Sequence, residues 1–207
     1  MKRFYFVRHG ESVGNAGKVY QPLDSGLSEL GIKQAQVMAE RCSKLPIRHI
    51  VSSTLARAQE TAEIISKKVG RSFESSDLLV EYRRPSQQRG LVRDSDESKN
   101  IDKIVADNFY TSGYHYSDEE NFQYLDKRAG EALKFLSSQK TNEILVITHG
   151  LFLRIMIGKA VFGDSFDPKM CQNVLNHMMT NNTGLSILEL DGDQWILRTF
   201  NDHAHLG

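Results

Sequence analysis

Two histidines, His9 and His149, occupy matching positions in the two halves of the chain. Each follows an apolar segment, residues 4–7 for His9 and residues 144–147 for His149, and each is followed by a glycine. A neutral imidazole can act as a nucleophile, and the guanidinium of Arg8 would attract an anion to the first one. One such motif is equally compatible with an ordinary hydrogen-bonding loop residue. Two motifs built alike, far apart in the chain, indicate a shared anion site.

Arg57 and Asn15 are further candidate anion ligands. Arg57 falls in the first turn of a helix that we predict to start at Thr54, with Ser53 or a neighbour as its cap. A cation is disfavoured at the amino end of a helix, but an anion in front of the helix would reverse that effect. The alternative is a solvated arginine on an exposed face. Asn15, in a polar loop of residues 10–26, either donates its amide to an anion or is a solvated turn residue.

Two other kinds of site are disfavoured by the sequence. Residues 14–18 resemble the phosphate-binding loop of nucleotide hydrolases, but Ser12 stands where that loop needs a glycine and Val19 where it needs a hydroxyl. His203 and His205 would share one face of an extended segment, as a candidate metal pair. No carboxylate or cysteine cluster lies near them, so we expect no metal site.

The apolar runs before the two histidines predict strands that are buried on both faces, as in the interior of a parallel sheet. Such strands deliver ligand-binding groups at their carboxyl ends. A helix capped by Ser28 ends before Pro46, and a capping box of Ser117 and Glu120 predicts a helix that runs to about Leu136. Three more strands are predicted, at residues 48–52, 184–190 and 194–200.

A polar stretch between these elements, residues 86–100, predicts a mobile surface loop or lid. Four arginines in and before it hint at a second anionic group on a substrate: Arg83, Arg84, Arg89 and Arg93. The aromatic segment of residues 108–124 either walls a substrate pocket or packs beneath this loop, and packing is the commoner role. We expect one domain over residues 1–207, with a lid or insert around residues 83–118.

Composition sets broad limits on the function. The 207 residues carry 26 Lys plus Arg and 26 Asp plus Glu, so the net charge gives no case for a nucleic-acid or membrane partner. The two cysteines have no paired spacing, and Cys42 falls on the apolar face of a predicted helix. Arg8 ends the first apolar run too early for a signal peptide. We therefore expect a cytoplasmic protein, whose oligomeric state is unknown from the sequence.

The motifs together resemble the histidine phosphatase superfamily, which contains the cofactor-dependent phosphoglycerate mutases and the bisphosphatases. The residues that carry the resemblance, in chain order, are Arg8-His9-Gly10-Glu11-Ser12, Asn15, Gly26-Leu27-Ser28-Glu29-Leu30-Gly31, Ser52-Ser53-x-Leu55-x-Arg57-Ala58, Glu81, Thr148-His149-Gly150, Asn182-Thr183-Gly184 and His205-Leu206. The resemblance covers nearly the whole chain. It implies an α/β fold, a three-layer α/β/α sandwich with a largely parallel central sheet.

The resemblance also implies roles for the site residues. His9 would become phosphorylated, through a nitrogen kept neutral because the other ring nitrogen donates to a backbone carbonyl. The phosphoryl oxygens would be held by a group of donors: Arg8, Arg57 and a protonated His149, with Asn15 and Gly150 assisting. Glu81 would be the proton donor, although the sequence Tyr82-Arg83-Arg84 that follows it departs from the usual pattern of the family.

The implied activity is that of a phosphoric monoester hydrolase of the histidine acid phosphatase type. It would hydrolyse a small-molecule phosphomonoester through a phosphohistidine, without a metal or cofactor. A mutase of the phosphoglycerate mutase type is the nearest alternative, disfavoured because Gly14 stands where mutases usually carry a tryptophan. A non-catalytic module that binds a phosphorylated ligand is a lesser alternative. The identity of the substrate is not encoded in any motif.

Overall fold

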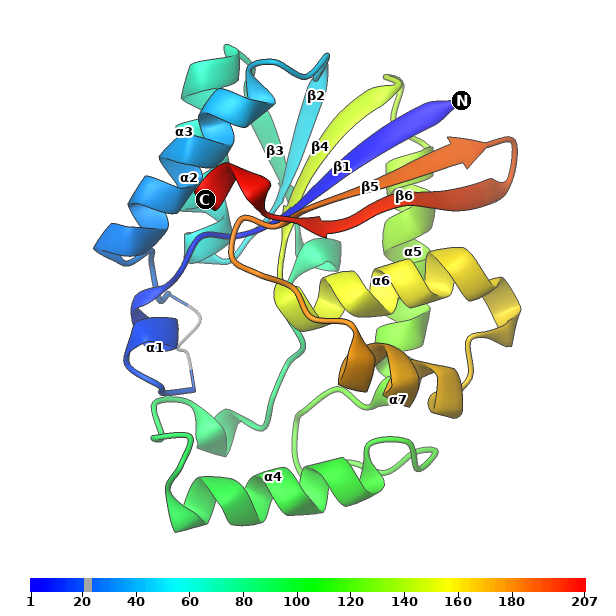
Figure 1. Ribbon diagram of the computed structural model, residues 1–207. Helices are drawn as coiled ribbons and strands as arrows, with labels where there is room; N and C mark the ends of the chain where they lie inside the picture. Colours follow the sequence, from blue (N-terminus) through cyan, green and yellow to red (C-terminus); the bar gives the residue numbers. More distant parts are fainter. Residues whose placement is uncertain (21–23) are drawn as a thin grey trace.

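A six-stranded sheet lies at the centre of the molecule, with helices on both of its faces (Figure 1). The computed structural model describes residues 1–20 and 24–207; residues 21–23, inside the predicted loop of residues 10–26, lie outside the described residues. The strands are β1 (Lys2–Arg8), β2 (His49–Ser53), β3 (Phe73–Ser76), β4 (Glu143–Thr148), β5 (Leu185–Asp191) and β6 (Gln194–Asp202). The helices are α1 (Val13–Ala16), α2 (Glu29–Cys42), α3 (Ala56–Val69), α4 (Asp96–Asn108), α5 (Phe122–Ser137), α6 (Gly150–Phe162) and α7 (Pro168–His177), with short 3-10 turns at η1 (Asp77–Leu79), η2 (Ser86–Gln88), η3 (Gly163–Ser165) and η4 (Ala204–Leu206).

The strand order is β3-β2-β4-β1-β5-β6. The first four strands in this order pair in parallel, whereas β5 pairs antiparallel with both β1 and β6. The predicted three-layer α/β/α fold with a largely parallel sheet is therefore confirmed. The hairpin of β5 and β6 extends the sheet at one edge, as the turn at residues 191–193 predicted.

Strand β1 is buried on both faces, as its unbroken apolar run predicted. Phe4 and Phe6 pack into one core cluster, whereas Tyr5 and Val7 pack into another on the opposite face, because successive side chains of a strand point to opposite sides. The first cluster is formed with α5 and α6, and the second with α2 and α3. This double burial fixes where β1 ends, and with it the position of the residues that follow.

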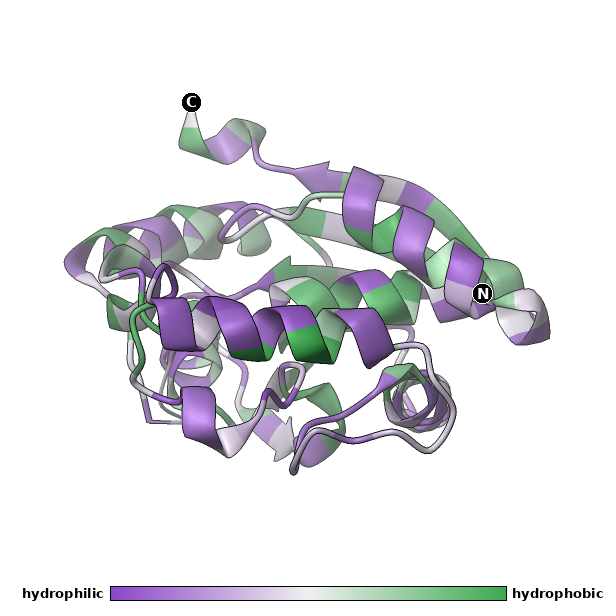
Figure 2. Ribbon diagram, turned by 90° about the horizontal axis from the view of Figure 1, so that it is seen from below, coloured by the Kyte–Doolittle hydropathy of each residue, from purple (hydrophilic) through white to green (hydrophobic). Residues whose placement is uncertain are grey.

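Helices α2, α3 and α5 are amphipathic, and their apolar faces cover the sheet, whereas α6 is apolar nearly all round. Figure 2 shows hydrophilic and hydrophobic residues alternating along helices of the molecule. In α2 the Ser28 side chain caps the helix by accepting from the amide of Gly31, and Ala35, Met38 and Cys42 form its buried stripe. Across the described ranges, 1–20 and 24–207, no helix is both long and apolar enough to cross a membrane.

Two predicted helix starts are wrong. Helix α3 begins at Ala56, with Leu55 as an N-cap that makes no side-chain hydrogen bond, because leucine has no polar side chain. The Ser53 hydroxyl accepts from the amide of Leu55, at 3.3 Å. Helix α5 begins at Phe122 and is capped by Asn121, so the predicted capping box does not form. The Glu120 carboxylate instead accepts from the guanidinium of Arg128, at 2.8 Å.

The polar stretch of residues 86–100 is more ordered than predicted. It contains η2 and the start of α4, which is capped by Ser95. In Figure 1, α4 lies apart from the sheet, beyond the end of β1 that leads to α1. In the aromatic segment of residues 108–124, Phe109 and Tyr110 pack against the core cluster of α5 and α6, so the packing interpretation is the correct one.

Candidate active site

The two histidines meet at the carboxyl ends of neighbouring strands. Strands β1 and β4 pair in parallel with Arg8 opposite Thr148, so the residues that follow them leave the sheet side by side. The centroids of the two imidazole rings are 5.0 Å apart, and both side chains are buried. The sequence expectation that His9 and His149 face one site is therefore consistent with the geometry.

The hydrogen bonds of His9 fix which of its nitrogens carries the proton. Nδ1 lies 2.6 Å from the carbonyl oxygen of Gly10, an acceptor, so Nδ1 is the protonated nitrogen. Nε2 then has a free lone pair, and it accepts from Nε of Arg57 at 3.2 Å. Burial, followed by the charges of Arg57 and Arg8, holds the pKa of His9 well below its ordinary value. His9 is thus a neutral imidazole with its basic nitrogen at Nε2.

Ser53 determines the tautomer of His149. Its fully buried hydroxyl accepts from the amide of Leu55 at 3.3 Å and lies 2.7 Å from Nε2 of His149. The hydroxyl proton needs an acceptor, and among the described residues Nε2 is the acceptor within reach. His149 then carries its own proton on Nδ1, a buried atom for which the described residues offer no partner. Sequence reasoning treated Ser53 as a helix cap and missed this contact.

The charge of His149 differs from the expectation. Burial has the largest effect on the pKa of His149, and the charges of the nearby His9, Arg57 and Arg8 lower this pKa further. The pKa therefore lies well below its ordinary value. The structure therefore favours a neutral ring rather than the protonated one that we expected. The ring still offers a donor, because the proton on Nδ1 does not depend on a positive charge.

Three buried donors around His9 lack partners within the described part of the chain. They are Nε of Arg8, one terminal nitrogen of Arg57 and Nδ1 of His149. Burial lowers the pKa of Arg8, and it lowers that of Arg57 to about 10, whereas the charge of Glu81 acts in the opposite direction on both. A buried donor without a partner costs about 1–3 kcal/mol, and more when it is charged. An anion that accepts from all three would remove this cost.

Gly150 supplies a further anion-binding element. It is the first residue of α6, a helix of 13 residues, whose amino end carries partial positive charge. A Cβ at this position would lie 3.1 Å from Nε of Arg8 and 3.0 Å from the hydroxyl of Thr180. Only glycine lets the helix end approach the Arg8 guanidinium so closely.

Glu81 lies in the same cavity but its carboxylate is engaged. It accepts from the amides of Leu151 and Phe152, at 3.3 and 3.0 Å, in the first turn of α6. Arg128, on α5, holds this segment in place by donating to the carbonyl of Val80 at 2.7 Å and lying 3.7 Å from the ring centroid of Phe152. The sequence did not indicate a role for Arg128, because a single arginine on the polar face of a helix looks like any solvated surface residue.

Asn15 borders the cavity from the short helix α1. Its Oδ1 accepts from the hydroxyl of Ser12 at 3.0 Å, in a capping box that orders the loop after β1. The amide nitrogen of Asn15 is left to donate into the cavity, which it lines. Asn15 thus borders the same cavity as His9 and Arg57.

Three further residues in or next to the cavity support the site residues. Asn182 donates to the carbonyl of His9 at 2.9 Å, and Thr180 accepts from a terminal nitrogen of Arg8 at 2.5 Å, so the segment before β5 supports both motif residues. Arg154 braces α6, where it donates to the carbonyls of Gly150 and Leu175, at 3.1 and 2.8 Å.

The terminal histidines take no part in this cavity. His205 contacts Arg41 and Thr183, and Nδ1 of His203 lies near the carbonyl of Asn201. No group of three potential metal ligands occurs among the residues described by the structure.

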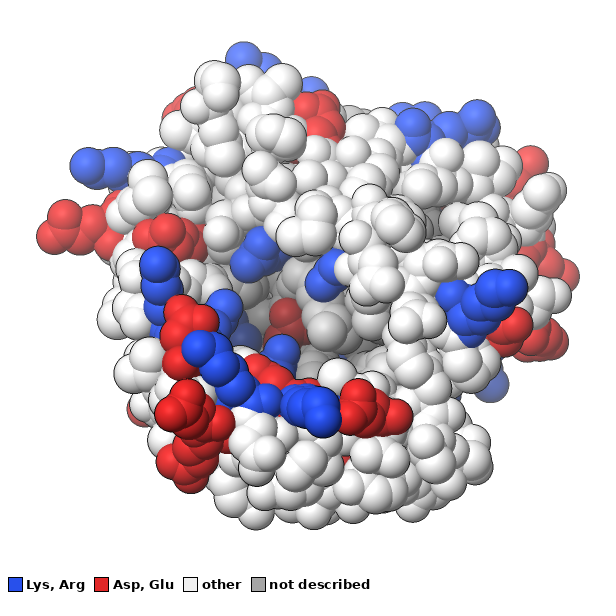
Figure 3. Space-filling view, turned by 60° about the horizontal axis from the view of Figure 1, so that its bottom comes forward, with Lys and Arg blue, Asp and Glu red and all other residues white. Residues whose placement is uncertain are grey.

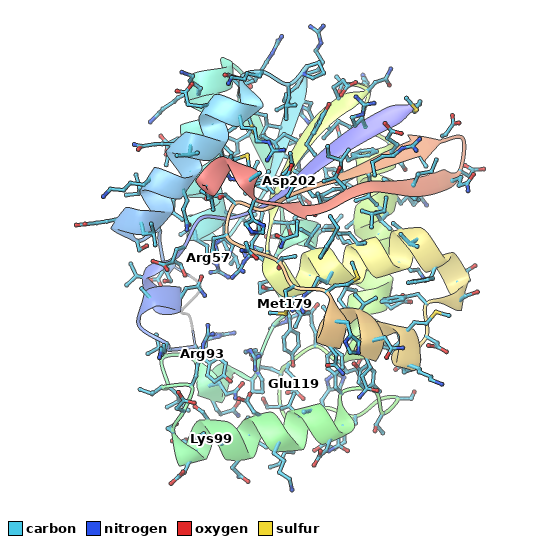
Figure 4. All side chains as sticks on the ribbon, in the orientation of Figure 1. Arg57, Arg93, Lys99, Glu119, Met179 and Asp202 are labelled. Atoms are coloured by element: carbon cyan, nitrogen blue, oxygen red, sulfur yellow. The ribbon has the colours of Figure 1, made fainter. Side chains whose placement is uncertain are left out.

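The cavity itself is large and rich in arginine. Its volume is about 820 Å³, within the range of sites that bind small molecules, roughly 300–1,000 Å³. It is lined by Arg8, His9, Asn15, Arg57, Glu81 and Gly150 at its inner end and by further arginines toward solvent. Figure 3 looks into it, with basic and acidic side chains visible inside the hollow and interleaved along one rim. In Figure 4, Arg57 and Met179 mark two of its walls.

Comparison with known proteins gives a match over nearly the whole chain. The family model of the histidine phosphatase superfamily (branch 1) matches residues 4–203. Phosphoglycerate mutase-like protein 4 of Arabidopsis thaliana is 32% identical over 207 residues, which cover 97% of this chain and 85% of that protein.

Solved structures share the same fold. YhfR of Bacillus stearothermophilus aligns with a TM-score of 0.84 and 26% identity, and the alignment covers 100% of both chains. The alpha-ribazole phosphatase of Shigella flexneri aligns with a TM-score of 0.81 and 22% identity, over 97% of this chain and 96% of that one.

Proposed function

The chain belongs to the histidine phosphatase superfamily, and from this premise we propose that it is a metal-independent phosphatase that hydrolyses a small phosphomonoester through a phosphohistidine on His9. The observation that carries the proposal is the set of buried donors around a neutral His9 for which the described residues provide no partner. A phosphoryl group has three oxygens that accept hydrogen bonds, which matches the three donors in number and in charge.

In the first step, Nε2 of His9 attacks phosphorus in line with the leaving oxygen. A bond forms between Nε2 and phosphorus, and the bond from phosphorus to the leaving oxygen breaks. The Nδ1 proton, donated to the Gly10 carbonyl at 2.6 Å, stabilises the positive charge that develops on the ring. In the second step, the oxygen of a water molecule bonds to phosphorus and the bond from phosphorus to Nε2 breaks, which releases inorganic phosphate and restores His9.

The remaining residues stabilise charge and move protons. Arg8 and Arg57 would hold the equatorial oxygens, and the Nδ1 proton of His149 would add a donor, as would the Gly150 amide and the Asn15 side chain. Glu81 would enter the reaction in its protonated form, give that proton to the leaving oxygen and later regain one from the attacking water. General acid–base catalysis of this kind contributes roughly 10²–10⁴ in rate.

The same proposal gives a role to the parts of the chain that surround the phosphoryl site. Residues 1–207 act as one domain, and the insert of residues 83–118 walls the outer part of the substrate site. Two fixed guanidiniums beside the phosphoryl group supply the charge that Mg²⁺ supplies in other phosphoryl-transfer enzymes.

Rapid-quench labelling tests the proposal. The protein is mixed with a ³²P-labelled phosphomonoester and quenched in alkali, which preserves phosphohistidine, or in acid, which destroys it. We expect an alkali-stable, acid-labile phosphoprotein that is lost in His9→Ala and kept in the control His203→Ala, an exposed histidine outside the cavity. Undiminished labelling of His9→Ala would refute the assignment.

A mutase is the second candidate, because the Arabidopsis relative carries a phosphoglycerate mutase-like name. A mutase must return the phosphoryl group to a second hydroxyl before water attacks. The Shigella protein on the same scaffold is a phosphatase, so the fold is compatible with either reaction. Interconversion of 2- and 3-phosphoglycerate, assayed with and without 2,3-bisphosphoglycerate, separates the two. Release of inorganic phosphate without interconversion supports the phosphatase.

A further inference from the structure

His205, on the 3-10 turn η4, is held between helix α2 and the segment before β5. Turn η4 packs against α2 and is drawn in red in Figure 1. Nδ1 of the half-buried ring lies 3.2 Å from a terminal nitrogen of Arg41, and Nε2 lies 3.1 Å from the hydroxyl of Thr183. None of these three residues lines the catalytic cavity, so the proposed reaction by itself gives them no role.

The partners of His205 fix its tautomer. An arginine side chain has only donors, so Nδ1 accepts from Arg41, and the ring proton lies on Nε2, which donates to Thr183. Arg41 is itself oriented by an ion pair with Asp202 at the end of β6. Burial, followed by the charge of Arg41, lowers the pKa of His205, whereas the charge of Asp202 acts in the opposite direction. The ring is therefore neutral at pH 7, and Nδ1 is free to accept.

Thr183 connects this ring to the catalytic motif. The hydroxyl that accepts from His205 donates in turn to the carbonyl of Asn182, at 2.8 Å, so its orientation is fixed. The amide of Thr183 donates to the carbonyl of Arg8 at 2.9 Å. The side chain of Asn182 donates to the carbonyl of His9, also at 2.9 Å. The peptide units before and after the proposed nucleophile are thus both held by this segment.

The backbone of Thr183 indicates that the segment needs support from its surroundings. Its φ of 55° lies in the left-handed region, which a β-branched residue rarely adopts because Cβ crowds the backbone. Such a conformation persists only where the surrounding contacts hold it. Thr183 is fully buried, and the contact that its hydroxyl accepts comes from His205.

A tilt of the main chain at His9 would reach the reacting nitrogen. The ring is oriented by the Gly10 carbonyl, 2.6 Å from Nδ1, and this carbonyl lies one peptide beyond the His9 carbonyl. If the segment of Thr183 shifts, the Gly10 carbonyl moves relative to the ring, and Nε2 turns away from the line of attack. Phosphoryl transfer depends steeply on that alignment.

We propose that His205 is a positioning residue for phosphoryl transfer: by holding Thr183, its ring keeps the main chain around His9 in the geometry that aligns Nε2 with phosphorus. This inference rests on the proposed phosphatase function. The alternative is a contact that only anchors η4 to the rest of the molecule. Such a contact would affect stability but neither the alignment of the nucleophile nor its tautomer.

Two substitutions of His205 separate these roles. His205→Leu removes both hydrogen bonds, whereas in His205→Gln the side-chain amide can accept from Arg41 and donate to Thr183. We expect His205→Leu to lower kcat for p-nitrophenyl phosphate about tenfold, as the loss of one hydrogen bond would, with KM changed by less than about twofold. His205→Gln should recover most of kcat.

The matched control is His203→Leu, at an exposed histidine two residues earlier, and it should keep the wild-type kcat. Two results would overturn the proposal. One is a lower Tm of His205→Leu with an unchanged kcat, and the other is a loss of kcat that His205→Gln shares in full.

Long-range ¹H–¹⁵N spectra read the same arrangement without turnover. In the wild type we expect the proton of His205 on Nε2 and that of His9 on Nδ1. Arg41→Gln should give His205 a mixture of tautomers, and His205→Leu should give His9 one. The control Arg71→Gln, an exposed arginine outside the cavity, should leave both rings unchanged. A wild-type His205 with its proton on Nδ1 would overturn the proposal even if His205→Leu did not fold.

Failure of the positioning role is distinguishable from failure of the phosphatase proposal. Equal turnover of p-nitrophenyl phosphate by the wild type and His205→Leu refutes only the positioning role. If no phosphomonoester is turned over, the phosphatase proposal fails, and the His9 spectrum of His205→Leu still tests the positioning role. A His9 spectrum identical to that of the wild type would then overturn it.

Discussion

Nε of Arg57 donates a hydrogen bond of 3.2 Å to Nε2 of His9, the nitrogen that the proposed reaction uses for attack. Arg57 therefore marks the place that a phosphoryl group would take beside His9. The contact also keeps a permanent cation against the ring, which favours the neutral imidazole. The first prediction follows from this pair.

Inorganic phosphate should stabilise the protein against heat. A ligand that binds only the folded state at 100 times its Kd adds about 2.7 kcal/mol, which raises the Tm of a chain of this size by roughly 5–10 °C. Differential scanning fluorimetry with increasing phosphate measures the shift. Arg57→Gln should lose most of it, whereas Arg71→Gln should keep it. An equal shift in Arg57→Gln would place the bound phosphate elsewhere.

Ser53→Ala should change the tautomer of His149 without removing any charge. The wild-type ring is expected to carry its proton on Nδ1, because the Ser53 hydroxyl lies 2.7 Å from Nε2 as donor. Long-range ¹H–¹⁵N spectra, assigned with His149→Asn, distinguish the two ring nitrogens. We expect Ser53→Ala to lose the pure Nδ1–H signature and to lower kcat/KM by about tenfold, since one buried hydrogen bond is worth about 1–3 kcal/mol.

Ser52→Ala is the matched control for that variant. Ser52 is equally buried on the same strand, and its hydroxyl donates to the Ser53 carbonyl at 3.0 Å rather than to a histidine. Its His149 spectrum should match the wild type. A wild-type spectrum with the proton on Nε2 would contradict the assignment made from the hydrogen bonds.

The free energy of unfolding should fall as the pH drops below about 6.5. Burial lowers the pKa of both His9 and His149, so between the folded and unfolded pKa values the unfolded chain binds more protons than the folded one. Stability is then full above the unfolded pKa and is lost as the pH falls, by up to about 1.4 kcal/mol per pH unit for each histidine.

Denaturant unfolding between pH 5.5 and 7.5, in a buffer free of phosphate, measures this slope. The double variant His9→Asn/His149→Asn should flatten it, and His203→Asn serves as the control. A slope that is the same in the double variant would show that these rings are not the source.

Gly31→Ala should damage both stability and activity. A Cβ on Gly31 would lie 1.9 Å from the carbonyl oxygen of Glu11, two residues after His9, so the loop that follows β1 must move. Overpacking of this kind costs about 1–3 kcal/mol. Gly130→Ala is the control: it lies within α5, its Cβ would meet nothing closer than 3.9 Å, and alanine favours the helix by roughly 0.5–1 kcal/mol. Comparable stability of the two variants would contradict this account.

Treatment with EDTA should leave phosphatase activity unchanged. The proposed reaction neutralises the phosphoryl oxygens with guanidiniums, amides and an imidazole, each fixed by the fold. Activity is measured after dialysis against EDTA and after readdition of Mg²⁺ or Zn²⁺. A loss of activity that either metal restores would mean that the charge stabilisation assigned to Arg8 and Arg57 is insufficient.

The sequence by itself determined the features that depend on neighbouring residues. The apolar runs that became β1 and β4 are local patterns, and so is the Ser28 cap of α2. Because these strands end where their apolar runs end, the sequence also located His9 and His149. Helix α4 was missed because its few buried residues, among them Ile101 and Val105, lie in a polar stretch where periodicity is faint.

Only the tertiary structure decided how the site is connected. The contact of Ser53 with His149 joins residues 96 positions apart, and Arg128 reaches the Val80 carbonyl from 48 positions away. Such contacts leave no local pattern, because each depends on how whole strands and helices pack. Burial is equally a property of the assembled sheet and helices, and it decides which donors lack partners and which imidazoles stay neutral.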